Sequence, residues 1–115
     1  MFTKGKDLKK ELTSHGKNIP LLKKVFLAKG VVPRIMQVAE SEFSEVCSMK
    51  DNCHSHPTMW ELYYVLEGEA KYFVGDEIYK VMPGDFVAVA PNTPHYQEIT
   101  KAPHRILYWG IAVED

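Results

Sequence analysis

The chain has 115 residues, of which 45% are hydrophobic and 25% charged, and its net charge is −1. This composition is typical of one globular domain and excludes a disordered chain. The longest run without a charged residue, 86–97, contains two prolines and is too short and too broken to cross a bilayer. The N-terminus lacks the apolar core of a secretion signal, so we expect a cytoplasmic protein with no membrane partner.

The charge is unevenly distributed along the chain. Residues 1–30 contain eight lysines and two acidic residues, a balance of +6, whereas the rest contains six basic and thirteen acidic residues, a balance of −7. A basic segment can bind nucleic acid, but this one has no arginine and only Phe2 and Phe26 as aromatic residues. We predict no nucleic-acid partner. Residues 1–30 are interpreted as a basic arm, part of the same domain, that lies over the acidic body of its own or a partner subunit.

Only the segment 3–15 has a helical pattern, because Leu8 and Leu12 are four residues apart and Gly16 can end a helix. Beyond the arm, short runs rich in Val, Ile, Tyr and Phe alternate with turn residues, a rhythm typical of an all-β sandwich or barrel. The expected strands are 31–39, 43–49, 52–56, 61–66, 70–74, 77–81, 86–90, 95–100 and 104–113. Turns are expected at 67–69, 75–76, 83–85 and 91–94. Residues 86–90 are apolar at every position, which predicts burial of both faces.

Two cysteines, Cys47 and Cys53, are too few for a disulfide scaffold and fit no zinc-binding spacing. We expect reduced thiols. A disulfide closing the small loop between them is the alternative, which nothing in the sequence requires.

Four residues form a candidate metal site. His54 and His56 are separated by one residue, so on a strand both imidazoles point to one face, with α-carbons about 6.6 Å apart. Glu61 opens the next strand after a bend at Pro57, and His95 begins a later strand. Three imidazole nitrogens and one carboxylate suit one divalent transition metal per chain (Fe, Mn, Ni, Co, Cu or Zn) rather than Mg or Ca. The alternative is a polar patch without metal. His15 and His104 are interpreted as hydrogen-bonded structural residues.

The spacing of these residues resembles a known family. The pattern His54-x-His56-x₄-Glu61-x₆-Gly68 is similar to the first signature of the cupin superfamily. Gly84-Asp85 followed by Pro91-x-x-Pro94-His95 is similar to the second. The second motif departs from the family pattern at Ala90, Asn92 and Ile99, but Asn92 tolerates the turn conformation of the usual glycine. The resemblance covers about residues 45–100.

A small single-domain cupin is an all-β protein with a double-stranded β-helix, or jelly-roll barrel, which the resemblance places over 31–115, preceded by a short helical or extended arm. Small cupins commonly dimerise. The alternation of the strand that begins at Glu61 agrees, because it turns Leu62, Tyr64 and Leu66 outward as an apolar face. We therefore predict a homodimer.

The same alternation predicts which residues line the pocket. Tyr63 lies on the face of Glu61, and Gln97 lies on the face of His95. Both are candidate contacts for a bound substrate, or else polar positions of the barrel wall.

The function implied by the resemblance is that of a metal-dependent enzyme of the dioxygenase, isomerase or lyase type. The expected substrate is a small polar oxygenated metabolite, such as a sugar derivative or an organic acid. Four protein ligands on a six-coordinate ion leave two positions for it. Glu61 is the candidate catalytic acid or base. The alternative is a non-enzymatic module that binds a sugar or acid, with a structural or ligand-anchoring metal.

Overall fold

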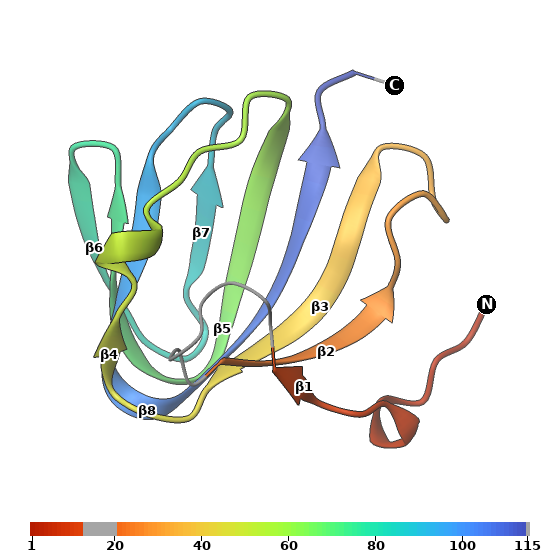
Figure 1. Cartoon of the computed structure of the whole chain (residues 1–115), viewed down its shortest axis with the longest axis horizontal. Helices are drawn as coiled ribbons and strands as arrows, with labels where there is room; N and C mark the ends of the chain where they lie inside the picture. The colour runs from red at the N-terminus through yellow and green to blue at the C-terminus, as the bar shows by residue number, and fades with distance from the viewer. Residues whose placement is uncertain (13–20, 115) are drawn as a thin grey trace.

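The computed structural model describes residues 1–12 and 21–114, and almost all of its regular structure is antiparallel β-sheet (Figure 1). The strands are β1 (Glu11–Leu12), β2 (Leu21–Leu27), β3 (Ile35–Phe43), β4 (Cys47–Ser48), β5 (Met59–Val74), β6 (Glu77–Val81), β7 (Phe86–Val89) and β8 (His95–Ala112). Two short 3₁₀ helices, η1 (Gly5–Asp7) and η2 (Lys50–Asn52), accompany them. No helix of the described residues is long and apolar enough to span a membrane.

Two facing walls form the barrel. The order β1-β2-β3-β8-β5-β6 joins both walls, with β4 added to β8 and β7 added to β5. The C-terminal half of β8 pairs with β3 and with the first half of β5, while its N-terminal half pairs with β4 and with the second half of β5. The long strands β5 and β8 therefore belong to both walls and bend across the bottom of the view in Figure 1. This is the predicted jelly-roll architecture.

The bend of β5 lies at Gly68, where a turn between two strands was predicted. The register with β8 shifts on both sides of this residue, and its φ is +76°. A glycine is needed because a Cβ atom there would collide with the carbonyl oxygens of Lys101 and Pro103. The prediction of separate strands at 61–66 and 70–74 was wrong, as was that at 95–100 and 104–113: a bulge lets each pair continue as one strand.

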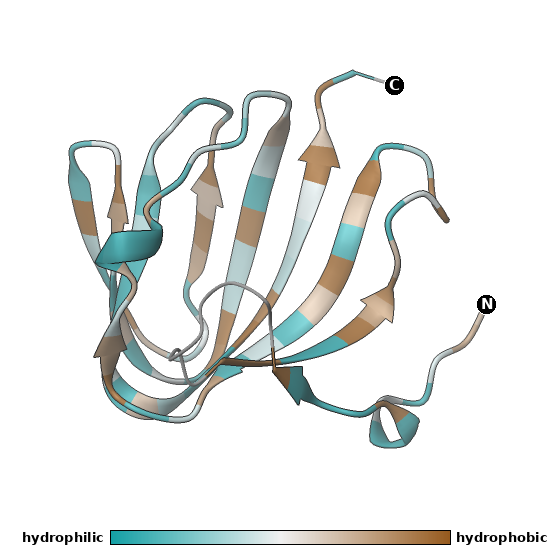
Figure 2. Cartoon of the chain, in the orientation of Figure 1, coloured by the Kyte–Doolittle hydropathy of each residue, from teal (hydrophilic) through white to brown (hydrophobic). Residues whose placement is uncertain are grey.

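Buried and more exposed residues alternate along β5 and β7. Figure 2 shows hydrophobic and hydrophilic residues interspersed along the strands. The inner faces form one apolar core that includes Tyr72, Val65, Ile99 and Ile106. Burial of both faces of 86–90 was wrong, because Phe86 and Ala88 are exposed while Val87 and Val89 are buried. The outer face of β7 therefore lies uncovered in the single chain.

The N-terminal region differs from its prediction. Within 3–12 only Gly5–Asp7 is helical, and Glu11–Leu12 pairs with β2, so the predicted helix was wrong over the described residues. The expected helix end at Gly16 and the interpretation of His15 as a structural residue concern positions outside the described residues. The segment 21–27, assigned to the arm, is a full strand of the barrel wall. An ion pair of 2.8 Å between Lys10 and Glu42 joins the arm to the acidic body of the same chain.

The remaining elements agree with the sequence predictions in part. Residues 77–81 form β6 as predicted, and Asn92 adopts a φ of +64°, the left-handed conformation expected of it. Residues 31–34 and most of 43–49 are not strand, and β3 extends to Phe43 instead. Cys47 and Cys53 form no disulfide in this structure, and their reduced state stays a prediction.

Candidate metal centre

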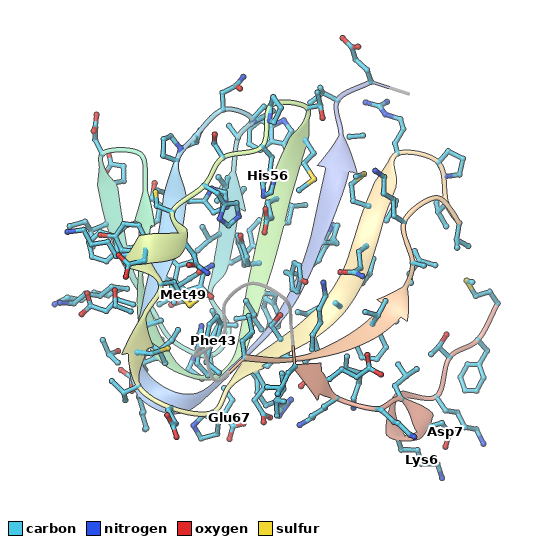
Figure 3. All side chains as sticks on the ribbon, in the orientation of Figure 1. Lys6, Asp7, Phe43, Met49, His56 and Glu67 are labelled. Atoms are coloured by element: carbon cyan, nitrogen blue, oxygen red, sulfur yellow. The ribbon has the colours of Figure 1, made fainter. Side chains whose placement is uncertain are left out.

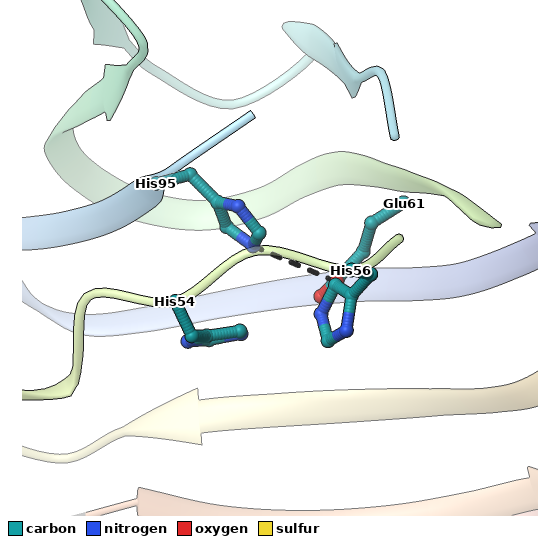
Figure 4. A group of neighbouring side chains, drawn as sticks. All are labelled: His54, His56, Glu61 and His95. Carbon is teal, nitrogen blue, oxygen red and sulfur yellow. Dashed lines mark ion pairs between the residues drawn. The ribbon is translucent and has the colours of Figure 1, made fainter. Parts of the chain in front are cut away.

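Three segments bring His54, His56, Glu61 and His95 together, here called the His₃Glu cluster (Figure 4). Glu61 is the third residue of β5, and His95 is the first residue of β8. His54 and His56 do not lie on a strand, contrary to the prediction. His54 makes an isolated bridge to His95, whose backbone it pairs with in both directions, and this bridge holds the loop beside β8.

The donor atoms of the cluster converge within the span of one coordination sphere. All of them lie within 4.8 Å of one another. Ligands about 2.1 Å from one ion lie about 3 to 4.2 Å apart, depending on geometry. Glu61 Oε2 is 2.6 Å from Nε2 of His56 and 3.6 Å from Nε2 of His95. Only small side-chain adjustments separate this arrangement from a four-donor site.

Backbone carbonyls fix the orientation of two imidazoles. Nδ1 of His54 lies 2.7 Å from the Asn52 carbonyl, and Nδ1 of His95 lies 2.9 Å from the Thr93 carbonyl. Because a carbonyl oxygen only accepts hydrogen bonds, each Nδ1 carries the proton and donates it. The neutral ring then has its lone pair on Nε2, the atom that faces the cluster. This is the arrangement by which proteins prepare histidines for metal binding.

The charges of the cluster suit a cation. Burial lowers the pKa of His56, although the Glu61 carboxylate acts in the opposite sense. Burial by itself would raise the pKa of Glu61, but contacts with His95 and Tyr63 bring it below its ordinary value. For His95, the Glu61 carboxylate and the Thr93 carbonyl outweigh burial, and the pKa is raised. At neutral pH the cluster therefore combines an anionic oxygen with a neutral His56.

Two buried atoms test whether a metal fits. Glu61 Oε2 and His95 Nε2 are buried and have no hydrogen-bond partner of acceptable geometry among the described residues. Leaving such atoms unpaired is costly in a folded protein. A divalent cation would satisfy both atoms at once, so the residues present fit the group.

A cavity of about 730 Å³ opens from the cluster into the barrel. His54, His56 and Glu61 line it, with apolar side chains that include Phe43 and Met49 deeper inside. Figure 3 shows His56 above these two side chains in the view. The volume is that of an ordinary small-molecule site.

Both predicted pocket residues line this cavity. Tyr63 is 3% exposed and donates a hydrogen bond of 2.5 Å to Glu61 Oε1. Burial and the neighbouring Glu61 carboxylate raise the pKa of Tyr63 well above its ordinary value, so the hydroxyl stays a donor. Gln97 also faces the cavity. Their contact with a substrate stays a prediction.

His104 lies outside the cluster, as predicted. Its Nδ1 donates to the Glu67 carbonyl, and Tyr72 Oη lies 2.9 Å from its Nε2. Sequence reasoning missed Lys23 and Tyr108, which also line the cavity. Lys23 could have been found from its spacing, because it lies two residues from both Leu21 and Val25 and so shares their face on a strand. Counting it with the basic arm obscured this pattern.

Comparison with known proteins supports one family. The model of the family described as "Cupin domain" matches residues 47–109, more than half of the chain. An uncharacterized protein of Methanocaldococcus jannaschii is 38% identical over 55 residues, which cover 47% of this chain and 44% of that protein. The chain thus spans less than half of the length of this curated relative.

Solved structures agree over nearly the whole chain. A predicted oxalate decarboxylase from Thermotoga maritima superposes with a TM-score of 0.85 at 19% identity, covering 97% of this chain and 99% of that one. KdgF from Halomonas sp. gives a TM-score of 0.79 at 14% identity, covering 100% and 96%. An RmlC-like cupin from Shewanella frigidimarina gives 0.72 at 19% identity, covering 96% and 88%. At such identities these similarities establish the fold alone.

Proposed function

The chain belongs to the cupin family, and we propose that it is an enzyme whose His₃Glu cluster holds a divalent transition metal and acts on a small oxygenated molecule. The observation that carries the proposal is a pair of buried donor atoms, Glu61 Oε2 and His95 Nε2, beside a cavity of about 730 Å³. Among the described residues neither atom has a hydrogen bond of acceptable geometry. Such a site combines a cation-binding constellation with room for a ligand beside it.

A bound metal would serve as a Lewis acid that polarises a substrate oxygen. The protein supplies the positioning. The Asn52 and Thr93 carbonyls hold two imidazole rings in place, and Tyr63 holds one oxygen of Glu61. The other oxygen, Oε2, is the atom of the chain that is placed to bind the cation or to accept a proton from the substrate.

The substitution Glu61→Gln tests this function. It preserves the size of the side chain and one oxygen donor but removes its charge and basicity. We expect this variant to retain much of its metal and to lose turnover by about a hundredfold or more, the usual contribution of a general base. The measurement is product formation by metal-loaded protein with sugars, uronates, 2-oxo acids and diols. Glu69→Gln is the matched control, because Glu69 lies on the same strand and pairs with Lys101 away from the cluster.

The non-enzymatic alternative gives a different result. A binding module with an anchoring metal would bind members of the same panel but convert none. In that case Glu61→Gln would weaken ligand affinity with no turnover to lose. Wild-type protein that holds its metal and converts no compound of the panel would replace the enzyme proposal with the binding module.

A further inference from the structure

The inner face of β2 carries a lysine where an apolar residue is expected. Lys23 lies on the same face of β2 as Leu21 and Val25, because the three residues are spaced two apart. Its register partner on β3 is Ser41, a buried residue of the inner face. Lys23 is partly buried and lines the cavity. Within the described part of the chain its ammonium group makes no hydrogen bond or ion pair. A cation at the wall of a cavity that forms no ion pair with the protein is left to pair with an anionic ligand.

The acidic residues of β3 face the other way, and on the opposite side of β2 the register partner Glu11 makes no ion pair with Lys23 in the described structure. Glu40 pairs in register with Lys24, on the outer face, and forms an ion pair of 2.8 Å with Arg105. Glu42 likewise contacts Lys10 outside the barrel. Among the described residues that line the cavity, Glu61 is the only acidic one, whereas Lys23 and Lys29 are both cationic. The body of the protein is acidic, but the cavity is not.

A row of aromatic contacts connects Lys23 with the cluster. Its Nζ lies 5.6 Å from the centre of the Tyr108 ring, a cation–π contact. The Tyr108 ring stacks on Tyr63 with centres 6.2 Å apart, and Tyr63 donates its hydroxyl hydrogen to Glu61. One wall of the cavity therefore runs from a cation across two aromatic rings to the His₃Glu cluster.

We propose that Lys23 is the anion-binding residue of this cavity and that the substrate carries a negatively charged group, most simply a carboxylate. The anionic group would pair with Lys23, an apolar middle would lie against Tyr108, and oxygen atoms at the other end would face the cluster. The last of these contacts rests on the proposed function. The pairing with Lys23 does not, because it needs no metal.

Matched ligand pairs test the proposal on metal-loaded protein. 2-Oxoglutarate and 2-oxopentanoate differ only in a carboxylate that replaces a methyl group, and 2-oxoadipate and 2-oxohexanoate repeat the comparison with a longer chain. We expect calorimetry to give at least about a tenfold tighter affinity for the dicarboxylate in one pair or both, as for a charge-assisted hydrogen bond. Lys23→Met should abolish this preference, and Lys23→Arg should keep it.

Lys24→Met is the matched control, because it removes an adjacent lysine from the outer face of the same strand. It should leave the preference unchanged. Equal affinities for both members of both pairs in the wild-type protein would overturn the proposal. So would a preference that survives in Lys23→Met, or one lost equally in Lys24→Met, which would indicate a general effect of net charge.

Chelator-stripped protein separates this proposal from the proposed function. Without metal, 4-phenylbutyrate should still bind at least about tenfold more tightly than 4-phenylbutan-1-ol, and Lys23→Met should abolish the difference. If the protein never takes up metal but shows this difference, the proposed function fails and the role of Lys23 stands. If metal binds stoichiometrically and the difference is absent, the role of Lys23 fails by itself.

Discussion

The hydroxyl of Tyr63 determines how one oxygen of Glu61 is used. Because Oε1 accepts this hydrogen bond, Oε2 is left for the cluster. Tyr63→Phe removes the donor and keeps the ring. We expect the affinity for a divalent transition metal to fall about tenfold to a hundredfold, as for other groups that orient metal ligands. Competition with a chromogenic chelator measures this affinity.

Tyr108→Phe is the control for that variant. Tyr108 stacks on Tyr63 but makes no hydrogen bond to Glu61 in the described structure. Its substitution should leave the metal affinity unchanged. A Tyr63→Phe variant that binds metal as tightly as the wild type would show that Glu61 needs no positioning.

His104 makes the stability of the fold depend on pH. Burial lowers its pKa, although the Glu67 carbonyl acts in the opposite sense. In the unfolded chain the same ring takes up a proton near its reference pKa of about 6.5. Its contribution to stability is therefore complete above about pH 6.5 and is lost as the pH falls toward the lower pKa of the folded state.

The variant His104→Gln isolates this contribution. At about pH 7.5 its free energy of unfolding should be about 1–3 kcal/mol below that of the wild type, because buried hydrogen bonds are disrupted. This difference should shrink between about pH 7.5 and 5.5, as measured by urea unfolding at each pH. A difference that stays constant across that range would contradict a neutral, buried His104.

At the scale of elements, the bend of β5 depends on Gly68. Gly68→Ala places a methyl group against two backbone carbonyls at a positive φ. We expect a loss of at least about 2 kcal/mol in the free energy of unfolding, from overpacking and backbone strain together. Gly84→Ala is the control, because Gly84 also has a positive φ, +95°, but an added Cβ meets no atom within 4 Å. If both variants lose the same free energy of unfolding, the backbone strain at a positive φ accounts for the loss and the collision with the carbonyls does not contribute.

Sequence patterns predicted the strands that bury one face. They failed where contacts between distant parts of the chain determine how a segment folds. The alternation around Glu61 and Tyr63 placed both residues on the inner face, as observed. A glycine between two strand-like segments is expected both for a hairpin turn and for a bulge. The sequence therefore could not predict that 61–66 and 70–74 form one continuous strand through Gly68. The strand at 21–27 was missed because the segment was counted with the lysine-rich residues 1–30, although five of its seven residues are apolar.

The ligand cluster was predictable for a different reason. The histidines and Glu61 have characteristic types and spacings, and the prediction that they gather does not depend on an exact strand assignment. The loop that carries His54 and His56 was wrongly predicted as a strand, yet its bridge to His95 brings both rings to Glu61. Lys23 has no such motif, and only the register with β3 reveals it.

At the scale of the whole molecule, the outer apolar face predicts a dimer. Trp60, Tyr64 and Phe86 are 43%, 40% and 54% exposed, and Phe86 lies beside Trp109 on the same sheet surface. A second copy is the partner that we propose, since the basic arm and the acidic body are complementary between copies as well. Light scattering at micromolar concentration should give twice the chain mass, and a monomer would contradict the proposal.

Substitutions locate that interface. Tyr64→Lys puts a charge into the proposed contact and should weaken dimerisation at least about tenfold. Ile78→Lys adds the same charge on β6, where the residue is 60% exposed, and should leave the dimer intact. A dimer that is insensitive to Tyr64→Lys would place the interface elsewhere.

The metal content of purified protein tests the central claim most directly. Elemental analysis of protein purified without chelators and then loaded with a divalent transition metal should give about one ion per chain. The double variant His54→Ala, His56→Ala removes two of the four donors and should hold almost none, while His104→Gln should match the wild type. Full metal retention in the double variant would contradict the account.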